Sequence, residues 1–559
     1  MSADQTNVDT FTIQIDGQPV AVQAGQTVLG AARQLGLDIP TLCYLEKCGP
    51  LNSCLVCLVK INGRLVPSCG TQVQPGMAVE SETSEVHEAR RTALELLFSD
   101  HVGDCLSPCN RLCPLGLNIP LMLRQIQAGH HAEASATLRG TLPLGGVLGR
   151  LCHHPCEQGC RRGHWDDPAG IRNLERFVSD WDSGRISPDS TAPGETRAPG
   201  EGRDAASRPA PAPINPLCKP ATGKSVMIIG AGPSGLAAAY YLTRQGHRVT
   251  VAHRQARAGG SLRAVPEADL PAAVLDAEIA LLAKLGVTFQ AGVTLGDEVT
   301  VEALSRESDA VLLAVGKLDP QQAARLGVPV AGGLVRSDPN TCKTPLGKVF
   351  ATGAATREVR QLVRAMGEGR AAAECVHRFL TSQAVRRPEK VFSSVMGRLD
   401  PGELRQFLAS ASAGHGVSPC DRCAGLSRPE AVAEASRCLH CDCRSSGNCV
   451  LQHYAQAYGA DANRFRAERK GFEQFPQPSG VIFEPGKCIL CGICVKLTEI
   501  AREPLGLTFI GRGFDVRVAA PLDRTIQDGL QKVAEECVRH CPTGALVFAD
   551  DGKLASQST

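Results

Sequence analysis

Cysteine is the residue type in this sequence that points most clearly to chemistry, because its thiolate binds metals and iron–sulfur clusters. The 559-residue chain has 25 cysteines, most of them in short runs. Residues 1–16 are polar and acidic, with no basic segment leading into an apolar run, and no stretch approaches 18 uncharged apolar residues. We therefore expect a cytoplasmic chain without a membrane span. In a reducing compartment these cysteines favour metal or cluster binding over disulfides.

The first run contains four cysteines with a tight pair at its centre. Two residues separate Cys54 from Cys57, ten residues separate Cys43 from this pair, and eleven separate the pair from Cys69. A tight pair flanked by one distant thiolate on each side suits a [2Fe–2S] cluster. A zinc site, which prefers two tight pairs, is the alternative. Cys48 falls outside the pattern and is expected to be a spare thiol.

The last run has the ferredoxin pattern for a [4Fe–4S] cluster. Cys488, Cys491 and Cys494 follow one another at steps of three, and Cys541 precedes a proline far downstream. Thr498 stands where a run of four would place its last cysteine. We therefore expect one cluster in this segment.

A further group of six cysteines lies before that run. Two residues separate Cys420 from Cys423, and four more cysteines follow closely. Any four of the six could bind a [4Fe–4S] cluster or a zinc ion. We favour a cluster on the last four, which are Cys438, Cys441, Cys443 and Cys449.

A glycine-rich turn marks a nucleotide-binding segment. An apolar strand at 226–229 runs into Gly230-x-Gly232-x2-Gly235, a helix follows, and a second strand is expected at 249–252. The glycines allow a tight turn and the close approach of a pyrophosphate to the start of a helix. The sequence contains no second fingerprint of this kind, so we expect no NAD(P) site on the chain.

Several domains have to position these residues, because 559 residues are too many for one core. Apolar residues alternate on either side of Asp16-Gly17 and predict a hairpin over 11–22, while the helical period of 27–37 predicts a helix. Residues 87–98 predict another helix. The stretch 184–222 is rich in Pro, Gly and Ser and is expected to be a disordered linker.

The predicted fold class is a multidomain mixture of α+β and α/β. Before the linker we expect a β-grasp [2Fe–2S] ferredoxin-like domain at 1–84 and a helical domain for two [4Fe–4S] clusters at 85–183. After it we expect a Rossmann-like, FAD-type nucleotide-binding domain at 223–383, a connector with a Cys-rich segment at 384–475, and a [4Fe–4S] ferredoxin-like domain at 476–559.

Both ends of the chain resemble the large iron–sulfur subunit of respiratory complex I and of iron hydrogenases. The stretch from Cys43 to Cys69 is similar to the [2Fe–2S] domain of that subunit, and the unit around Cys488 resembles its single-cluster [4Fe–4S] domain. His101, with three residues between it and Cys105 after a Leu-Glu-Leu-Leu helix, also matches. This resemblance implies that His101 ligates a [4Fe–4S] cluster.

The middle resembles the glutamate synthase small subunit and dihydropyrimidine dehydrogenase, through "CNRLCPLGLNIP" and "GRLCHHPCEQGCRRG". In that family two [4Fe–4S] clusters take interleaved ligands. Carried over by position, the resemblance implies one cluster on Cys105, Cys109 and Cys160, with His101 in place of a missing cysteine. It implies a second cluster on Cys113, Cys152 and Cys156, with Glu175 as a non-cysteine ligand.

The same resemblance implies FAD in the nucleotide-binding domain. The positions that match the family's flavin site are Gly230, Gly232, Pro233, Ser234, Gly235, Gly259, Gly260, Leu262, Arg263, Gly316 and Gly353. His253 replaces the acidic residue expected to hold the ribose, and Ala354 replaces an aspartate near the flavin. Only 32 residues separate Gly316 from Val349, so the family's NAD(P)-binding insertion is missing.

These features predict an electron-transfer subunit of a cytosolic multisubunit NAD(P)-linked oxidoreductase, of the bifurcating transhydrogenase, hydrogenase or formate dehydrogenase type. The expected cofactors are one [2Fe–2S] cluster, three or four [4Fe–4S] clusters and FAD, and no catalytic side chain is assigned. The expected partners are other redox subunits, above all one that oxidises NADH, and ferredoxin.

Two other functions stay open. One is a self-sufficient NAD(P)H oxidoreductase like the glutamate synthase small subunit, and the other is a non-catalytic metal-bound scaffold or redox sensor. The charge is nearly balanced, with 59 basic and 57 acidic residues, and only 4% of residues are aromatic. Both numbers argue against nucleic-acid binding.

Overall fold

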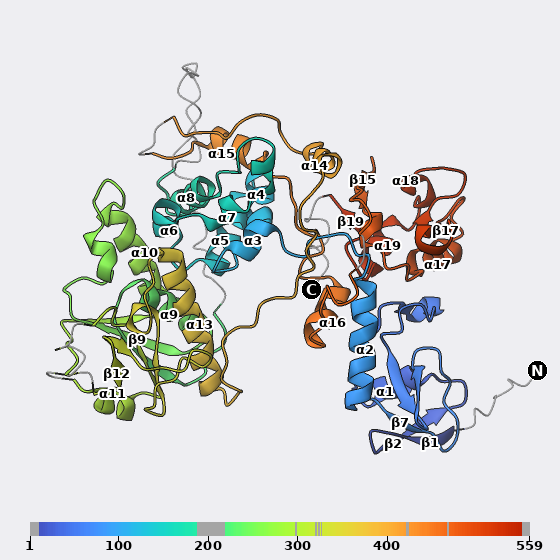
Figure 1. The fold of residues 1–559 in the computed structure, drawn as a ribbon, viewed down its shortest axis with the longest axis horizontal. Helices are drawn as coiled ribbons and strands as arrows, with labels where there is room; N and C mark the ends of the chain where they lie inside the picture. Colours follow the sequence, from blue (N-terminus) through green and yellow to red (C-terminus); the bar gives the residue numbers. More distant parts are fainter. Residues whose placement is uncertain are drawn as a thin grey trace, which may run out of the picture. The chain divides into compact units, whose positions relative to one another are not determined.

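The computed structural model of the chain divides into two compact units, each built from segments that are separate in the sequence (Figure 1). It describes residues 10–186, 218–296, 299–318, 321, 325, 327–420, 424–466 and 469–549. Unit 1 contains residues 1–107, 391–409 and 441–559, and unit 2 contains residues 108–390 and 410–440. Both units therefore combine stretches of chain that are far apart in the sequence.

Unit 1 begins with a five-stranded mixed sheet in the order β2-β1-β7-β5-β6. Strands β1 and β7 pair in parallel, and the other described pairs are antiparallel. The strands of this sheet are β1 (Thr10–Ile15), β2 (Gln18–Gln23), β5 (Leu58–Ile61), β6 (Arg64–Pro67) and β7 (Ala78–Glu80). The pairing of β1 with β2 agrees with the hairpin predicted over 11–22.

Local sequence explains this part of unit 1. Ile13 and Ile15 are buried and alternate with polar neighbours in β1, so one face of the sheet is apolar. Asp16 and Gly17 both have positive φ and form the tight turn into β2. Thr27 caps α1 (Val28–Gln34) by accepting a hydrogen bond from a backbone N–H. The hairpin and the helix therefore form where the apolar pattern predicts them.

The rest of unit 1 contains the predicted C-terminal cysteine run. Its helices are α2 (Ser84–Leu97), α14 (Pro401–Leu408), α16 (Val450–Ala457), α17 (Ile493–Ile500), α18 (Ile526–Gly529) and α19 (Ala534–His540). Its other strands are β3 (Tyr44–Leu45) with β4 (Gly49–Pro50), β15 (Phe475–Pro476) with β16 (Val481–Phe483) and β19 (Leu546–Phe548), and β17 (Thr508–Ile510) with β18 (Arg517–Ala519). One hydrophobic cluster includes Cys43, Leu94, Leu451 and Cys491, so distant cysteine runs share a core.

Unit 2 begins with a helical layer that carries two cysteine runs. Its helices are α3 (Pro108–Leu112), α4 (Ile119–Gln127), α5 (His131–Thr141), α6 (Gly145–Leu151), α7 (Pro155–Gln158) and α8 (Ile171–Asp182). Helix α15 (Arg428–Ala435) packs against α4 and α8, although it comes much later in the sequence. The segment 410–440 is thus part of the helical layer.

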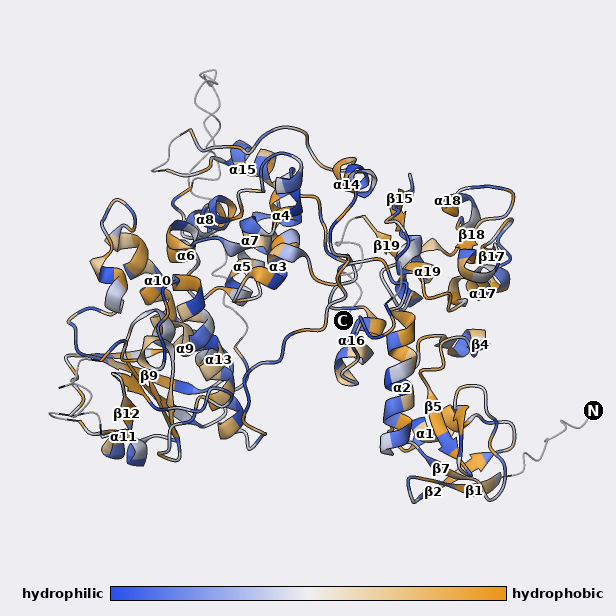
Figure 2. Cartoon of the chain, in the orientation of Figure 1, coloured by the Kyte–Doolittle hydropathy of each residue, from blue (hydrophilic) through white to orange (hydrophobic). Residues whose placement is uncertain are grey.

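The second part of unit 2 is an all-parallel sheet in the order β10-β9-β8-β11-β14. Its strands are β8 (Ser225–Ile229), β9 (Arg248–His253), β10 (Thr288–Ala291), β11 (Ala310–Leu313) and β14 (Val349–Ala351). Helices α9 (Pro233–Arg244), α10 (Ala272–Lys284), α11 (Val301–Glu307) and α13 (Leu362–Leu380) accompany the sheet, with a small hairpin of β12 (Val330–Ala331) and β13 (Leu334–Val335). The strands around β9 are mostly hydrophobic, as a sheet covered on both faces requires (Figure 2).

Two expectations concern segments rather than elements. The predicted linker at 184–222 lies mostly, over 187–217, outside the described residues. In the part of the chain that the structure describes, no helix is long and apolar enough to cross a membrane.

Candidate cofactor sites

The four cysteines of the first run meet in the interior of unit 1. Cys43, Cys54, Cys57 and Cys69 are all buried. Their thiols are hydrogen-bonded to one another: contacts with Cys54 and Cys69 lower the pKa of Cys43, and a contact with Cys69 lowers the pKa of Cys57. The structure thus brings this predicted set together as one group of sulfur atoms.

A strained loop presents the central pair to the two outer thiols. Asn52 and Leu55 have φ values of 55° and 54°, a region that non-glycine residues adopt only where the fold requires it. The Cys69 thiol donates a hydrogen bond to Asn52 Oδ1 over 3.3 Å. The Asn52 side chain packs directly over Gly70, where an added Cβ would require that side chain to move. The loop therefore depends on residues outside the cysteine pattern.

The last cysteine run lines a small cavity in unit 1. Its lining includes the four predicted residues Cys488, Cys491, Cys494 and Cys541. Leu490 has a φ of 53°, and its N–H donates a hydrogen bond to Cys488 Sγ over 3.4 Å. Burial raises the pKa of Cys488 to about 12. A hollow lined by thiols that resist ionisation fits a group that binds thiolates and compensates their charge.

Two residues near this cavity, Thr498 and Cys537, are buried but do not line it. Thr498 is buried, donates a hydrogen bond to the Val495 carbonyl over 2.8 Å, and accepts one from Leu507 N–H over 3.0 Å. Cys537 is buried and lies with its Sγ 3.9 Å from the Cys494 carbonyl oxygen, but it does not line the cavity. The cavity therefore has four cysteine thiols around it.

A second small cavity lies in unit 2. Cys113, Cys152 and Cys156 line it together with Glu175 of α8, which agrees with the set predicted from the family resemblance. Glu175 is 5% exposed. Burial, and then repulsion from Glu157, raises the pKa of Glu175 to about 8, while burial raises that of Cys152 to about 12. Three thiols and one carboxyl group thus surround the same space.

Cys105 lies in unit 1 with two cysteines of the late group, Cys443 and Cys449. The Cys443 N–H donates a hydrogen bond to the Cys105 carbonyl oxygen over 3.4 Å. Burial raises the pKa of Cys443 to about 11 and that of Cys449 to about 12, and repulsion from Cys105 adds to both effects. The three thiols are therefore close enough for their charges to interact.

A lysine and a serine complete the polar surroundings of these thiols. Cys105 Sγ lies 3.2 Å from Ser394 Oγ. Lys487 is 3% exposed and forms an ion pair with Glu484. Burial alone would lower the pKa of Lys487, but the Cys443 thiolate and Glu484 together raise it. A buried ammonium group beside buried thiols favours the thiolate form that ligates metals.

His101 belongs to the same surroundings. Its Nδ1 atom is buried and has no hydrogen-bond partner. Burial, followed by repulsion from Lys487, lowers the pKa of His101 to about 3. A neutral imidazole with a vacant ring nitrogen is the form in which histidine ligates a metal.

The division between the units separates two of the predicted ligand sets. His101 and Cys105 belong to unit 1, whereas Cys109 and Cys160 belong to unit 2. In the late group, Cys438 belongs to unit 2 and the three later cysteines to unit 1. Sequence spacing gave no sign of this division, because the segments that meet are hundreds of residues apart.

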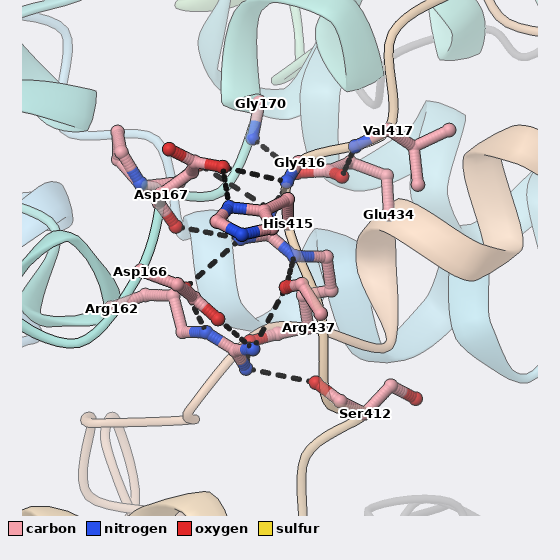
Figure 3. A network of polar contacts seen from close by, with 12 residues as sticks. Arg162, Asp166, Asp167, Gly170, Ser412, His415, Gly416, Val417, Glu434 and Arg437 are labelled. Atoms are coloured by element: carbon pink, nitrogen blue, oxygen red, sulfur yellow. Dashed lines mark hydrogen bonds and ion pairs between the residues drawn. The ribbon is translucent and has the colours of Figure 1, made fainter.

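Buried basic residues next to the cysteine runs were not predicted as part of any site. Arg162 and Arg437 in unit 2 are at most 2% exposed, and Figure 3 shows them in one network of ion pairs and hydrogen bonds. Lys487 in unit 1 is equally hidden. Each stands one or two residues from a cysteine, but the sequence cannot tell a buried basic residue from an exposed one.

The nucleotide fingerprint has the geometry that its glycines predict. Gly230 has a φ of 110°, and a Cβ there would collide with the Ala314 carbonyl group. A Cβ on Gly235 would collide with the Gly230 carbonyl oxygen, whereas the space beside Gly232 is open. The turn from β8 to α9 thus leaves room for a phosphate group at the start of the helix.

The other residues of the predicted flavin site are grouped around this turn. The Gly259–Gly260 turn touches Gly232, and Gly353 lies against Ser234, whose hydroxyl donates a hydrogen bond to the Ala365 carbonyl over 2.8 Å. The remaining predicted residues are Pro233 at the start of α9, Leu262 and Arg263 after the Gly259–Gly260 turn, and Gly316 after β11. The fold therefore gathers residues that follow β8, β11 and β14 at the carboxyl ends of these parallel strands.

His253 ends β9, the strand next to β8 in the sheet. Its side chain is 7% exposed, and its Nδ1 atom is buried without a hydrogen-bond partner. Burial lowers the pKa of His253, so the imidazole is neutral. A neutral imidazole can exchange a hydrogen bond with a hydroxyl group, which is the task of the missing carboxylate.

Among the described residues, no three His, Cys, Asp or Glu side chains converge as the ligands of one metal ion do. A zinc ion needs its sulfur ligands about 2.3 Å from a single point, whereas a cluster spreads its cysteines over several iron atoms.

Three segments of the chain match known protein families. Residues 8–84 match the 2Fe-2S iron-sulfur cluster binding domain, and residues 80–185 match the 4Fe-4S cluster domain II of dihydropyrimidine dehydrogenase. Residues 191–369 match the pyridine nucleotide-disulphide oxidoreductases. The chain thus carries two kinds of iron–sulfur domain and one oxidoreductase domain of the flavin type.

Curated relatives match parts of the chain. The NADP(+)-dependent formate dehydrogenase subunit beta of Moorella thermoacetica is 39% identical to this chain over 223 residues. The matched segment covers 40% of this chain and 31% of that protein. The NAD-dependent dihydropyrimidine dehydrogenase subunit PreT of Escherichia coli (strain K12) is 35% identical to this chain over 228 residues. The matched segment covers 40% of this chain and 49% of that protein. The glutamate synthase [NADPH] small chain of Mycobacterium tuberculosis is 35% identical over 217 residues, 38% of this chain and 39% of that one.

The chain therefore spans about a third to a half of the length of these relatives. A crystal structure of an NAD+-reducing [NiFe]-hydrogenase in the H2-reduced state is 40% identical over 16% of this chain and 39% of that one, with a TM-score of 0.16. The predicted resemblance to the glutamate synthase small subunit and to subunits of redox complexes is confirmed by the curated relatives.

Proposed function

We propose that this chain is an electron-transfer subunit of a multisubunit NAD(P)-linked oxidoreductase. The observation that carries the proposal is the presence of several separate groups of buried thiols in one chain, together with one dinucleotide-type turn. Clusters carry single electrons, and a flavin exchanges pairs of electrons for single ones. The relatives named as subunits of formate dehydrogenase and dihydropyrimidine dehydrogenase support the same role.

Four ligand sets follow from the groups just described. We assign a [2Fe–2S] cluster to Cys43, Cys54, Cys57 and Cys69, and a [4Fe–4S] cluster to Cys488, Cys491, Cys494 and Cys541. We assign a second [4Fe–4S] cluster to Cys113, Cys152, Cys156 and Glu175. In place of the set predicted from the sequence, we assign a third to His101, Cys105, Cys443 and Cys449.

The protein groups around these thiols would set how readily each cluster accepts an electron. Lys487 places a positive charge beside Cys443, which stabilises the more negative, reduced state of a nearby cluster. The backbone N–H of Leu490 stabilises negative charge on Cys488 Sγ in the same way. Burial works in the opposite direction and disfavours added charge.

FAD fits the parallel sheet of unit 2. The open space beside Gly232 suits a pyrophosphate group, and the unpartnered Nδ1 of His253 suits a ribose hydroxyl group. The chain has no second glycine fingerprint for a pyridine nucleotide. We therefore infer that a partner subunit exchanges electrons with NAD(P)H and that this chain passes them on.

Reduction of the isolated chain tests this division of labour. Dithionite should bleach its visible absorption, whereas NADH and NADPH should leave it unchanged until the partner subunits are added. Bleaching by NADPH alone would instead support a self-sufficient oxidoreductase like the glutamate synthase small chain. Absence of any reducible absorption would support the metal-bound scaffold.

A further inference from the structure

We propose that Cys438, from a segment far downstream, ligates the same [4Fe–4S] cluster as Cys109 and Cys160. This inference rests on the proposed function and changes the ligands expected from spacing. It replaces His101 and Cys105, which belong to unit 1, and it removes Cys438 from the late group of four.

Cys109 and Cys160 are neighbours because two short helices of unit 2 pack together. Cys109 lies in α3 and Cys160 follows directly after α7, and the two helices are in contact. A Cβ on Gly159 would collide with the Leu112 side chain, one helical turn after Cys109. Two thiols of the site are therefore held at one place.

Cys438 reaches this place through a buried hydrogen bond. Arg162, two residues after Cys160, donates a hydrogen bond from Nη1 to the carbonyl oxygen of Arg437 over 3.0 Å. Arg437 directly precedes Cys438, which packs against the same hydrophobic cluster as Cys109 and Cys160. This hydrogen bond joins the backbone next to Cys438 to the side chain of Arg162, which stands close to Cys160 in the sequence.

The two arginines belong to the network in Figure 3. Arg162 forms a bidentate ion pair with Asp166, with both N···O distances 2.6 Å, and Arg437 Nη2 lies 3.2 Å from the same carboxylate. Arg437 Nη1 also donates to Glu434 Oε1 over 2.8 Å. Both guanidinium groups and Glu434 are at most 2% exposed. So many charges out of water fix the returning segment in one position.

Further hydrogen bonds hold the returning segment, residues 410–440, in place. Arg162 donates to the carbonyl oxygens of Ser412 and Gly414 over 3.0 and 3.2 Å. Glu434 accepts hydrogen bonds of 2.6 Å from the N–H groups of Gly170 and Val417. The segment is therefore attached to the helical layer along its length, and not at Cys438 alone.

The loop that begins at Cys438 has the shape of the ferredoxin-type loop in unit 1. His440 has a φ of 48°, and its N–H donates a hydrogen bond to Cys438 Sγ over 3.4 Å. Leu490 has a φ of 53°, and its N–H donates to Cys488 Sγ over the same distance. A left-handed non-glycine residue is costly and persists where function requires it.

Iron counting on paired substitutions separates this grouping from the one predicted by spacing. Each cysteine is replaced by alanine in the full chain, which is purified anaerobically, and iron and acid-labile sulfide are measured per chain. Our grouping places Cys438 with Cys109 and apart from Cys443. C438A/C109A should therefore lose about four irons, and C438A/C443A about eight. The spacing-based grouping predicts the reverse result, which would overturn the proposal.

Single variants give a second test that does not require a double variant to fold. C438A and C160A should abolish the same electron paramagnetic resonance signal, and C443A a different one. C537A is the matched control, because Cys537 is buried but lines no site, and it should keep every signal. An unchanged spectrum in C438A would overturn the proposal. Absence of iron and sulfide in the unsubstituted chain would instead overturn the proposed function.

Discussion

Two groups of cysteines in this molecule are assembled in different ways. Cys43 to Cys69 lie within one short stretch, and a strained loop brings their thiols together. Cys109, Cys160 and Cys438 come from three separate stretches, and buried arginines hold the last of them in place. Spacing alone predicts a site of the first kind, whereas a site of the second kind becomes visible only when the chain is folded.

The largest effect is expected from the buried network. Replacing the fully buried Arg162 by methionine leaves the partly buried Asp166 carboxylate with less compensation; breaking a fully buried pair costs about 3–5 kcal/mol, and this pair should approach the lower end of that range. Arg162→Met should therefore lower the thermal stability of the chain and remove about four irons. Differential scanning calorimetry and iron analysis measure both.

An exposed ion pair supplies the control for that variant. Arg360 and Glu358 form a pair whose side chains are 85% and 75% exposed. Arg360→Met should change the free energy of unfolding by about 1 kcal/mol or less and leave the iron content unchanged. Equal effects of the two substitutions would show that the buried network does not position a ligand.

The locally assembled group should respond in a confined way. Cys57→Ala should remove about two irons and the [2Fe–2S] signal, with every other signal retained. Cys48 is the matched control, since it lies in the same segment and is buried but outside the set. Loss of iron in Cys48→Ala, or loss of several clusters in Cys57→Ala, would contradict the independence of this group.

A smaller effect is expected in the nucleotide-binding sheet, where the glycine turn is local but the ribose contact comes from the next strand. A charged hydrogen bond is worth about 1.5–3 kcal/mol. His253→Glu should therefore tighten FAD binding to the deflavinated chain about tenfold, and His253→Leu should weaken it. Titration followed by flavin fluorescence measures both. Equal affinity of all three proteins would place the ribose elsewhere.

The smallest effect concerns Thr498, which occupies the position of a missing cysteine. Its hydroxyl group makes two hydrogen bonds within the backbone around α17. Thr498→Cys should cost about 1 kcal/mol of stability and leave the iron content unchanged, because a fifth thiol has no cluster to join. A gain of about four irons would show that the segment can hold a second cluster.

The sequence predicted the elements whose signals are local. The β1–β2 hairpin follows from alternation around Asp16-Gly17, and the strand–turn–helix at Gly230 follows from its glycine spacing. The thiol sets at Cys43–Cys69 and Cys488–Cys541 follow from their spacing in the same way. In these places the physical constraint acts between residues that are close in the sequence.

The rest depended on tertiary contacts. Spacing grouped Cys438 with Cys443, yet the structure assigns them to different units. Burial of Arg162 and Arg437 decides where the returning segment lies, and neither residue differs in the sequence from an exposed arginine. The orphaned Nδ1 of His101 is likewise a property of the folded chain.

The central claim, that the chain holds five clusters as an electron-transfer subunit, is tested most directly by iron and acid-labile sulfide per chain. One [2Fe–2S] and four [4Fe–4S] clusters require about 18 irons, with a matching amount of sulfide. Anaerobically purified protein should contain this amount of iron and sulfide. Dithionite should reduce the protein to a state with several paramagnetic signals. Stoichiometric zinc with little sulfide would contradict the account.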